Sequence, residues 1–319
     1  MIEHLQKIIL DVDTGIDDAL SILYALGEEN AKLIGVTTTF GNIDLEQAAS
    51  NTLSILDLAG ATNIPVYKGS SSSLSSEEYI RREVTTRIHG EDGIGDANIE
   101  SSTRTTKEQN AVDFLVEAAL EYGQELKLIC VGPLTNLAKA YQKNSEALQN
   151  VAEIVIMGGA LTVPGNATKF AEANIIEDEV AAKMILESDL PLKMVGLDVT
   201  MRTILTQAET DQWEEYDTEQ SQAIVKMTQH YFQSYRDRLG MLGCALHDPL
   251  AVGIALHPEL AKTLALDLTV ELEEPAKGLT IGDNKRIYHK KPTTGVCIQI
   301  DQEKFLAHFM HAMENVLKM

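Results

Sequence analysis

The sequence predicts an α/β protein: a single domain with a mostly parallel central sheet, flanked by helices in an open, Rossmann-like arrangement. Apolar runs with strand propensity alternate with stretches of helical period, which is typical of parallel strands joined by crossover helices. Polar or glycine-rich loops follow the expected strands, and parallel sheets bind ligands at the carboxyl ends of their strands. The length of 319 residues suits one compact unit spanning residues 1–319.

The individual elements follow from local periodicity and from helix and turn signals. After a first strand that begins at Lys7 and a helix that follows it, strands are expected at residues 31–39, 64–67, 126–131, 151–157 and 191–196. Helices are expected at 45–58, 111–122, 178–186, 207–217, 219–239, 249–256 and 302–318, with another beginning near 135. Apolar and polar residues alternate at 264–272 and 296–301, which predicts edge or antiparallel strands.

Residues 69–107 form a long connection without strong periodicity. Such a segment is expected to be either a mobile lid or a disordered linker. It contains a glycine-punctuated loop that carries His89. This residue fits a role at the lid, and it also fits a surface histidine without a role.

The first strand runs into four aspartates, Asp11, Asp13, Asp17 and Asp18, within eight positions. Side chains alternate along a strand, so Asp11 and Asp13 are expected on the same face at its carboxyl end. Gly15 is expected to allow the turn, and the last two aspartates fall in the first helical turn. The helix dipole cannot offset the repulsion among four carboxylates, so a hard cation such as Ca²⁺ or Mg²⁺ is expected there.

The acidic turn also fits a simpler structure, a solvated acidic helix start, which is a common arrangement. An EF-hand loop does not fit, because Gly15 occupies its fifth position and Ile22 its twelfth. A phosphatase-type Asp-x-Asp-x-Thr site would need its threonine one place later than Thr14. A cation site and a solvated helix start are therefore the two structures that this stretch allows.

Composition limits the classes of ligand and the cellular setting. With 48 acidic and 26 basic residues, the formal net charge is −22, which argues against nucleic-acid binding and suits a neutral or cationic small ligand. Cys130, Cys244 and Cys297 are few and far apart, so a reducing cytoplasm is expected in place of a disulfide framework. No signal-like segment precedes Lys7 and no apolar run is long enough for a membrane span, so no membrane partner is expected.

Several motifs occur in a fixed order along the chain: Asp-x-Asp-Thr-Gly-x-Asp-Asp at 11–18, Gly-Asn at 41–42, the turn at Val131, Met-Gly-Gly at 157–159, Asn166, Glu-x-Asn at 172–174 and His-Asp-Pro at 247–249. In this order and spacing the sequence resembles the inosine-uridine type nucleoside hydrolases. The resemblance extends over nearly the whole chain. It implies Ca²⁺-dependent hydrolysis of the N-glycosidic bond of ribonucleosides, giving free base and ribose.

The resemblance implies a metal site. Asp13, Asp18 and Asp248 would coordinate Ca²⁺ through their carboxylates, and the main-chain carbonyl of Val131 would complete the protein's ligands. Asp13 would also be the general base that activates a water molecule. Asp11 would orient its neighbours without binding the metal.

The same resemblance implies a ribose pocket. The implied contacts are Asp17 and Asn174 to the 2′-hydroxyl, Asp248 to the 3′-hydroxyl, and Glu172 with Asn166 to the 5′-hydroxyl, while Met157 and Asn42 line the pocket. Several hydroxyl contacts to buried polar groups would favour ribose over deoxyribose.

At the base end, His247 is the implied acid, Tyr235 would relay a proton or stack, and His89 would close over the base. Leu239 stands where some relatives carry a polar or basic residue, and Trp213 lies outside the matching positions. Inosine-uridine preference or broad specificity is therefore expected.

Two further functions are compatible with the sequence. One is a hydrolase of a modified or pyrimidine-only nucleoside, with the same ribose and metal residues. The other is a non-catalytic, Ca²⁺-dependent nucleoside or sugar binding protein, or a Ca²⁺-stabilised structural module, for which Asp13 would not need to be a carboxylate. The resemblance also implies a homo-oligomer, a tetramer or a dimer.

Overall fold

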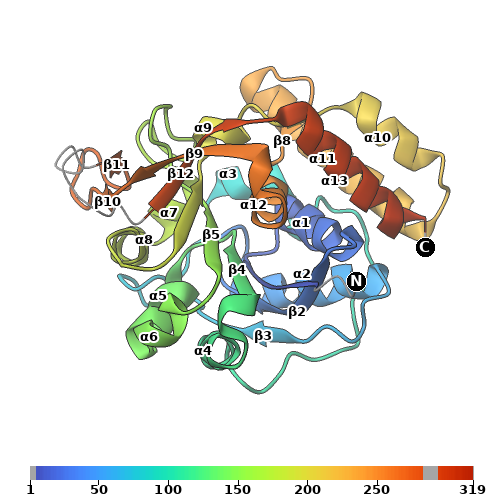
Figure 1. Ribbon diagram of the computed structural model, residues 1–319. Coiled ribbons are helices and arrows are strands. Elements are labelled where there is room, and N and C mark those ends of the chain that lie inside the picture. The colour runs from blue at the N-terminus through green and yellow to red at the C-terminus, as the bar shows by residue number, and fades with distance from the viewer. Residues whose placement is uncertain (1–4, 283–293, 319) are drawn as a thin grey trace.

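A central, mostly parallel sheet forms the middle of the protein (Figure 1). The computed structural model describes residues 5–282 and 294–318. The strands of this sheet are β1 (Gln6–Val12), β2 (Ala31–Thr38), β3 (Val66–Lys68), β4 (Leu126–Cys130), β5 (Glu153–Met157), β6 (Leu192–Val195), β9 (Ala261–Leu266) and β12 (Thr294–Ile300). Within the described ranges the sheet has eight strands in the order β3-β2-β1-β4-β5-β6-β12-β9. Only the β12–β9 pair in this sheet is antiparallel, which confirms the predicted fold class.

Helices cover both faces of the sheet (Figure 1). One face packs against α1 (Ile16–Gly27), α2 (Leu45–Leu58), α12 (His247–Leu256) and α13 (Gln302–Leu317), with α10 (Gln207–Glu214) and α11 (Glu219–Leu239) farther out. The other face packs against α4 (Ala111–Tyr122), α5 (Thr135–Lys143), α6 (Ser145–Gln149) and α8 (Glu179–Leu186). Each face therefore has its own apolar core, and β1 lies between the two with its last five residues buried.

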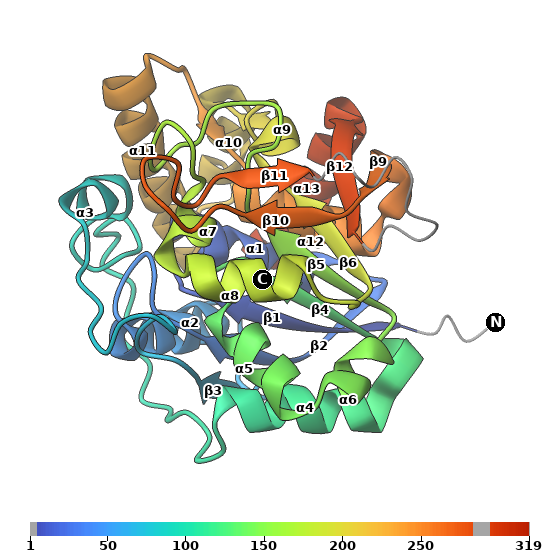
Figure 2. The same ribbon diagram turned by 90° about the vertical axis from the view of Figure 1, so that its left-hand side faces the viewer.

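Short elements gather around the carboxyl ends of the strands. They are α3 (Glu83–His89), α7 (Ala173–Glu177), α9 (Leu197–Thr200) and the antiparallel pair β7 (Ile204–Leu205) and β8 (Cys244–Ala245). A further pair, β10 (Leu268–Val270) and β11 (Thr280–Gly282), forms a separate two-stranded sheet, and two 3₁₀ turns lie at Gly123–Glu125 and Pro258–Leu260. Figure 2 shows α3 beside α11 at one end of the main sheet.

The long helices agree with the sequence prediction because their ends carry capping residues. The predicted ranges 45–58, 111–122 and 219–239 match α2, α4 and α11. Asp44, Asn110 and Thr218 each accept a hydrogen bond from a backbone N–H of the first helical turn. A side chain that satisfies such an N–H fixes where the helix begins. Among the described residues, no helix is both long and apolar enough to cross a bilayer.

Of two strand predictions near the end of the chain, one was wrong in part. The predicted strand 264–272 is divided between β9, an edge strand, and β10, which belongs to the separate small sheet. The predicted strand 296–301 is β12, and its antiparallel pairing with β9 confirms the antiparallel alternative, while its parallel pairing with β6 excludes an edge position. Alternation of apolar and polar residues reports a strand but does not identify its neighbours.

The segment 69–107 is tied to the body of the protein. It contains helix α3, and the guanidinium of Arg81 donates hydrogen bonds to the backbone carbonyls of Asn42, at 3.0 Å, and Gly90, at 2.7 Å. The N–H of Lys107 donates to Val66 in β3 at 2.8 Å. The disordered-linker alternative was therefore wrong, and a lid role stays a prediction.

Candidate active site

A cavity of about 690 Å³ lies at the carboxyl ends of the parallel strands. Its lining includes the predicted site residues Asp13, Asp17, Asn42, His89, Val131, Met157, Asn166, Glu172, Asn174, Tyr235, His247 and Asp248. The other predicted residue, Asp18, is fully buried next to Asp17. The structure therefore brings together side chains that are up to 235 positions apart in sequence, from Asp13 to Asp248.

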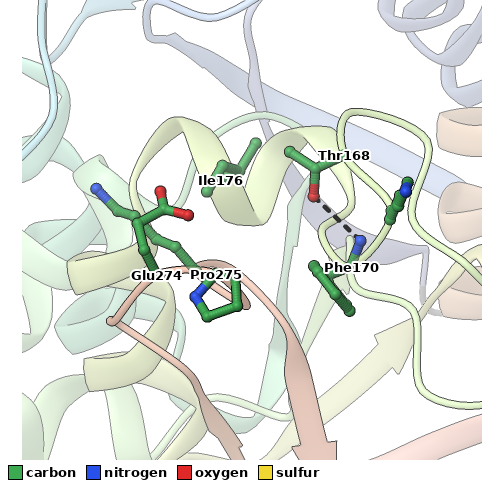
Figure 3. A pocket seen from close by; sticks show the side chains of 7 residues that line it. Thr168, Phe170, Ile176, Glu274 and Pro275 are labelled. Atoms are coloured by element: carbon green, nitrogen blue, oxygen red, sulfur yellow. Dashed lines mark hydrogen bonds between the residues drawn. The ribbon is translucent and has the colours of Figure 1, made fainter.

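A second, shallower pocket of about 450 Å³ lies beyond the loop that carries Asn166 (Figure 3). Figure 3 shows Phe170 and Pro275 along its wall, with the hydroxyl of Thr168 accepting a hydrogen bond from the Phe170 N–H at 3.1 Å. Among the described residues, its lining contains a single carboxylate, Glu274, and no histidine. The larger cavity is therefore the candidate active site.

The acidic turn between β1 and α1 is held in place by its own carboxylates. Asp18 accepts hydrogen bonds from the backbone N–H of Asp13 at 3.0 Å and of Gly15 at 2.9 Å, and from the side-chain amide of Asn42 at 3.0 Å. Asp13 Oδ2 accepts the backbone N–H of Asn42 at 2.6 Å. Asp18 therefore fixes the turn, and the first two strand ends are joined through Asn42.

Gly15 is required for a reason other than the turn itself. Its backbone is extended, with φ −89° and ψ −160°, a conformation open to any residue. A Cβ atom at this position would lie 2.6 Å from Nδ1 of His89 and 2.7 Å from Nδ2 of Asn42. The absence of a side chain lets these two residues approach the aspartates.

Two buried carboxylate oxygens of this cluster face the cavity without a protein partner. Asp13 Oδ1 and Asp17 Oδ1 accept no hydrogen bond from the described part of the chain. Asp17, Asp18 and Asp248 each offer an oxygen, and these three oxygens lie within 4.8 Å of one another. This geometric group contains Asp17 where the resemblance implied Asp13. An oxygen-rich, anionic set of this kind fits a hard divalent cation.

The electrostatics of the cluster support the same fit. Burial and then repulsion by Asp18 raise the pKa of Asp17 to about 7 and the pKa of Asp13 well above its ordinary value. Burial and then the charge of Asp17 raise the pKa of Asp248 well above its ordinary value. Buried carboxylates this close together repel one another when all of them are ionised. A positive ion among them would stabilise the ionised forms.

Asn174 and Glu172 organise a further part of the cavity wall. The amide of Asn174 donates to the carbonyls of Val131 at 2.6 Å and of Met157 at 3.2 Å. Glu172 accepts one backbone N–H from the turn after β5 and two at the start of α7, among them that of Asn174 at 3.0 Å. Asn166, exposed at the cavity mouth, accepts the N–H of Ala173 at 3.0 Å. These contacts hold the wall in place before a ligand binds.

A chain of hydrogen bonds links three side chains, two of which line the cavity. Tyr235 Oη lies 2.8 Å from His247 Nε2, and His247 Nδ1 lies 2.8 Å from Thr200 Oγ1. Burial lowers the pKa of His247 to about 4, so the imidazole is neutral near pH 7. One turn earlier on α11, the hydroxyl of Tyr231 donates to Asp17 Oδ2 at 3.1 Å.

His89 does not lie on a mobile loop, so that part of the prediction was wrong. It is the last residue of α3, buried, and its Nδ1 accepts the backbone N–H of Ile16 at 3.1 Å. Burial, and then the positive charge of Arg81, lower its pKa to about 3. A neutral imidazole is therefore fixed against the start of α1, 3.9 Å from Asp17 Oδ1.

Several residues of the site carry no clear signal in the sequence. Tyr231 belongs to an aromatic stripe of four-residue spacing on α11, which is a common core pattern. No motif and no periodic pattern includes the other four residues, which are Thr200, Arg82, Glu177 and Arg238. Arg82 and Glu177 form an ion pair that joins the start of α3 to the end of α7, and Arg238 lines the cavity at the end of α11.

A family model described as inosine-uridine preferring nucleoside hydrolase matches residues 8–307. This chain belongs to that family. The nucleoside hydrolase is 34% identical to a probable uridine nucleosidase 2 of Arabidopsis thaliana, over 93% of this chain and 94% of that protein. It is 31% identical to an inosine-uridine preferring nucleoside hydrolase of Crithidia fasciculata, over 98% of each. A solved structure, a purine-preferring ribonucleoside hydrolase from Gardnerella vaginalis, superposes with a TM-score of 0.96 at 41% identity, covering 98% of this chain and 99% of that one.

The family assignment confirms the resemblance seen in the sequence and identifies an enzyme that hydrolyses ribonucleosides. The single α/β domain with its eight-stranded sheet agrees with the folds of the solved nucleoside hydrolases. The acidic cluster described above is a possible metal site of this enzyme.

Proposed function

We propose that this nucleoside hydrolase uses Ca²⁺ to hydrolyse inosine, uridine and related purine and pyrimidine ribonucleosides to free base and ribose. The observation that carries the proposal is the pair of buried, unpartnered oxygens on Asp13 and Asp17 at the floor of the cavity. The same cavity is lined by a neutral histidine, His247, whose Nε2 lies 2.8 Å from the Tyr235 hydroxyl. The cavity therefore combines carboxylates for the metal ion and the sugar with side chains that can pass a proton to the base. This combination suits cleavage of an N-glycosidic bond.

Four groups would hold the metal ion: the carboxylates of Asp13, Asp18 and Asp248 and the carbonyl oxygen of Val131. That carbonyl accepts a hydrogen bond from Asn174 at 2.6 Å, and its second lone pair remains for a cation. When bound, Ca²⁺ would hold the ribose hydroxyls and one water molecule and make that water more acidic.

Asp13 is the proposed general base. Its Oδ2 is held by the Asn42 N–H at 2.6 Å, so Oδ1 is the atom left to take a proton. The backbone N–H of Asp13 is itself bonded to Asp18, so the carboxylate is fixed before a ligand arrives. A base held in this way needs no reorganisation when it removes a proton from water.

The ribose contacts are proposed for residues that line the same cavity. Asp17 and Asn174 would bind the 2′-hydroxyl, Asp248 the 3′-hydroxyl, and Glu172 with Asn166 the 5′-hydroxyl, next to Met157 and Asn42. Anionic and amide oxygens around the sugar would stabilise positive charge that develops at C1′ and the ring oxygen.

These assignments predict strong selectivity for ribose over 2′-deoxyribose. Inosine and 2′-deoxyinosine share the base, so the comparison isolates the 2′-hydroxyl. We expect kcat/KM to be about 10²–10³-fold lower for the deoxynucleoside, because Asp17 and Asn174 would each be left with an unpaired buried group. The assay is release of reducing sugar from each nucleoside. Equal kcat/KM values would contradict the ribose assignments.

The base end is proposed to protonate the departing base. Tyr235 would pass its hydroxyl proton to the departing base and take one back from His247 Nε2, which lies 2.8 Å away, and solvent would return a proton to the neutral His247. His89, fixed on α3, would lie over the base. Tyr235→Phe removes the relay hydroxyl and keeps the ring.

We expect Tyr235→Phe to lower kcat on inosine by about 10²-fold, because the base leaves poorly without a proton. The rate on a 4-nitrophenyl riboside should change little, since that leaving group needs no proton. Tyr141→Phe, on a tyrosine of α5 that lies outside the cavity lining, serves as the matched control and should behave as wild type. Equal losses on both substrates would show that Tyr235 acts on sugar binding in place of leaving-group protonation.

A preference for purines is the second candidate, because the solved structure with 41% identity is named purine-preferring. A panel of inosine, adenosine, guanosine, uridine and cytidine, assayed for free ribose, distinguishes the two preferences. Activity on none of them would favour a modified nucleoside or a binding protein.

The three buried free thiols support a cytoplasmic setting, and the homotetramer or dimer stays a prediction that analytical ultracentrifugation can test.

A further inference from the structure

A second cluster of metal-ligating side chains lies at the opposite end of the sheet from the cavity. Glu28 follows the last residue of α1, His257 follows the last residue of α12, and His308 lies in the middle of α13. One ligand atom from each lies within 4.8 Å of the others. The cluster is only half-buried, and none of its members lines the active-site cavity.

We propose that Glu28, His257 and His308 form a second metal site, which binds Zn²⁺ or a similar borderline transition-metal ion. Two imidazoles and one carboxylate are a ligand set typical of zinc, whereas Ca²⁺ prefers oxygen ligands alone. Glu28 Oε1 and His257 Nε2 are 3.1 Å apart. Ligands bound tetrahedrally to one zinc ion lie about 3.3 Å apart, so this pair has nearly the required spacing.

The third ligand is in place to join this pair. The rings of His257 and His308 lie side by side and tilted, with centroids 4.2 Å apart and planes inclined by 34°. A simple ion pair between Glu28 and His257 has no need of a second imidazole.

A second carboxylate lies near the other ring nitrogen of His257. Glu259 Oε1 lies 4.0 Å from Nδ1 of His257, on the side away from Glu28, and Glu259 is held by Lys304 at 3.5 Å. At 4.0 Å this is an ion-pair distance and not a hydrogen bond, so Glu259 adds negative charge beside the proposed ligands without fixing the His257 ring.

The position of the cluster suggests what the ion does. Helix α1 carries Asp17 and Asp18 in its first turn, and α12 carries His247 and Asp248 in its first turn. The proposed ion would link the carboxyl ends of the same two helices to α13. Metal binding would therefore stabilise the helix layer that positions the active site without contacting the substrate.

The test uses full-length, tag-free protein that has been stripped with a chelator and then kept in about 1 mM Ca²⁺, which occupies the acidic cluster. Zn²⁺ is added in a calorimetric titration, and Co²⁺ is added for its visible absorption. Wild type is expected to bind one equivalent of Zn²⁺ and to gain in Tm. His308→Gln should bind at least about 100-fold more weakly and lose that gain, while keeping wild-type turnover of inosine in the absence of zinc.

The matched control is His311→Gln, on an exposed histidine one turn further along α13. This variant should bind Zn²⁺ as wild type does, and His257→Gln provides a second test if His308→Gln folds poorly. The proposal is overturned if wild type binds no Zn²⁺ in the presence of Ca²⁺, or if His308→Gln and His257→Gln bind it as wild type does. It is also overturned if zinc binding is abolished by Asp248→Asn, because the ion would then lie in the active site.

Discussion

Asp13→Asn is expected to lower kcat on inosine by about 10³–10⁴-fold while leaving the protein folded. An amide has nearly the shape of the carboxylate, and its oxygen can still accept the Asn42 N–H that Asp13 Oδ2 accepts at 2.6 Å. An amide cannot remove a proton from water, and it is a weaker metal ligand than a carboxylate. The measurement is ribose release at saturating inosine and saturating Ca²⁺, with circular dichroism to check the fold.

The control for this experiment is Asp44→Asn, two residues beyond Asn42. Asp44 caps α2 by accepting the Gln47 N–H at 3.0 Å, and asparagine caps a helix about as well as aspartate. This variant removes one negative charge from the same region and should keep wild-type activity. If Asp13→Asn retained more than about a tenth of wild-type kcat, the general base would have to be another group, and Asp17 would be the first to examine.

Calcium affinity separates the two roles assigned to Asp13. If Asp13 both binds the metal and removes the proton, Asp13→Asn should weaken Ca²⁺ binding, yet saturating Ca²⁺ should not restore kcat. A ligand role alone would be rescued by excess metal. The titration therefore distinguishes catalysis from a structural contribution of this carboxylate.

The part of the site predicted from sequence is the part encoded in short, local motifs. Asp13, Asp17 and Asp18 lie on one strand, turn and helix, where side-chain alternation and the helix start fix their directions. Asn42 follows the neighbouring strand, so the parallel sheet brings it to the same edge. The described structure joins Asp13, Asp18 and Asn42 in one network of hydrogen bonds.

The part that could not be predicted depends on contacts between distant segments. His89 lies in a segment without periodicity, and its place is set by the N–H of Ile16, which is 73 positions away in sequence. Thr200 reaches His247 across 47 positions through an ordinary hydroxyl, a residue type with no distinctive spacing. Chain topology sets such pairs, and local sequence does not report them.

Removing the metal is expected to abolish turnover and to change how stability depends on pH. Burial and mutual repulsion raise the pKa of Asp17 to about 7 and the pKa values of Asp13 and Asp248 well above the ordinary 3.8. In the metal-free protein the folded state therefore holds protons that the unfolded state has already lost. Stability must then fall as the pH rises from about 4 through about 7, because the folded state is the one that binds more protons.

Calcium should offset the loss of stability that the metal-free protein shows as the pH rises. The ion displaces protons from the cluster, so the gain in Tm on adding Ca²⁺ to chelator-treated protein should be larger at pH 8 than at pH 5, by about 5 °C or more. Activity at pH 7.5 should fall by at least about 10³-fold on chelation and return with Ca²⁺. Differential scanning calorimetry at pH 5, 6, 7 and 8, with and without Ca²⁺, gives the stability curves, and ribose release gives the activity.

Asp248→Asn tests whether the acidic cluster causes this pH dependence. The variant removes one of the repelling charges, so its metal-free Tm should fall less steeply between pH 5 and pH 8, and its gain from Ca²⁺ at pH 8 should shrink. Asp113→Asn, on a surface aspartate of α4 outside the cavity lining, should leave the difference between metal-free and Ca²⁺-loaded curves unchanged. Wild-type curves that ran parallel with and without Ca²⁺ would mean that the raised carboxyl pKa values and the metal site are unrelated.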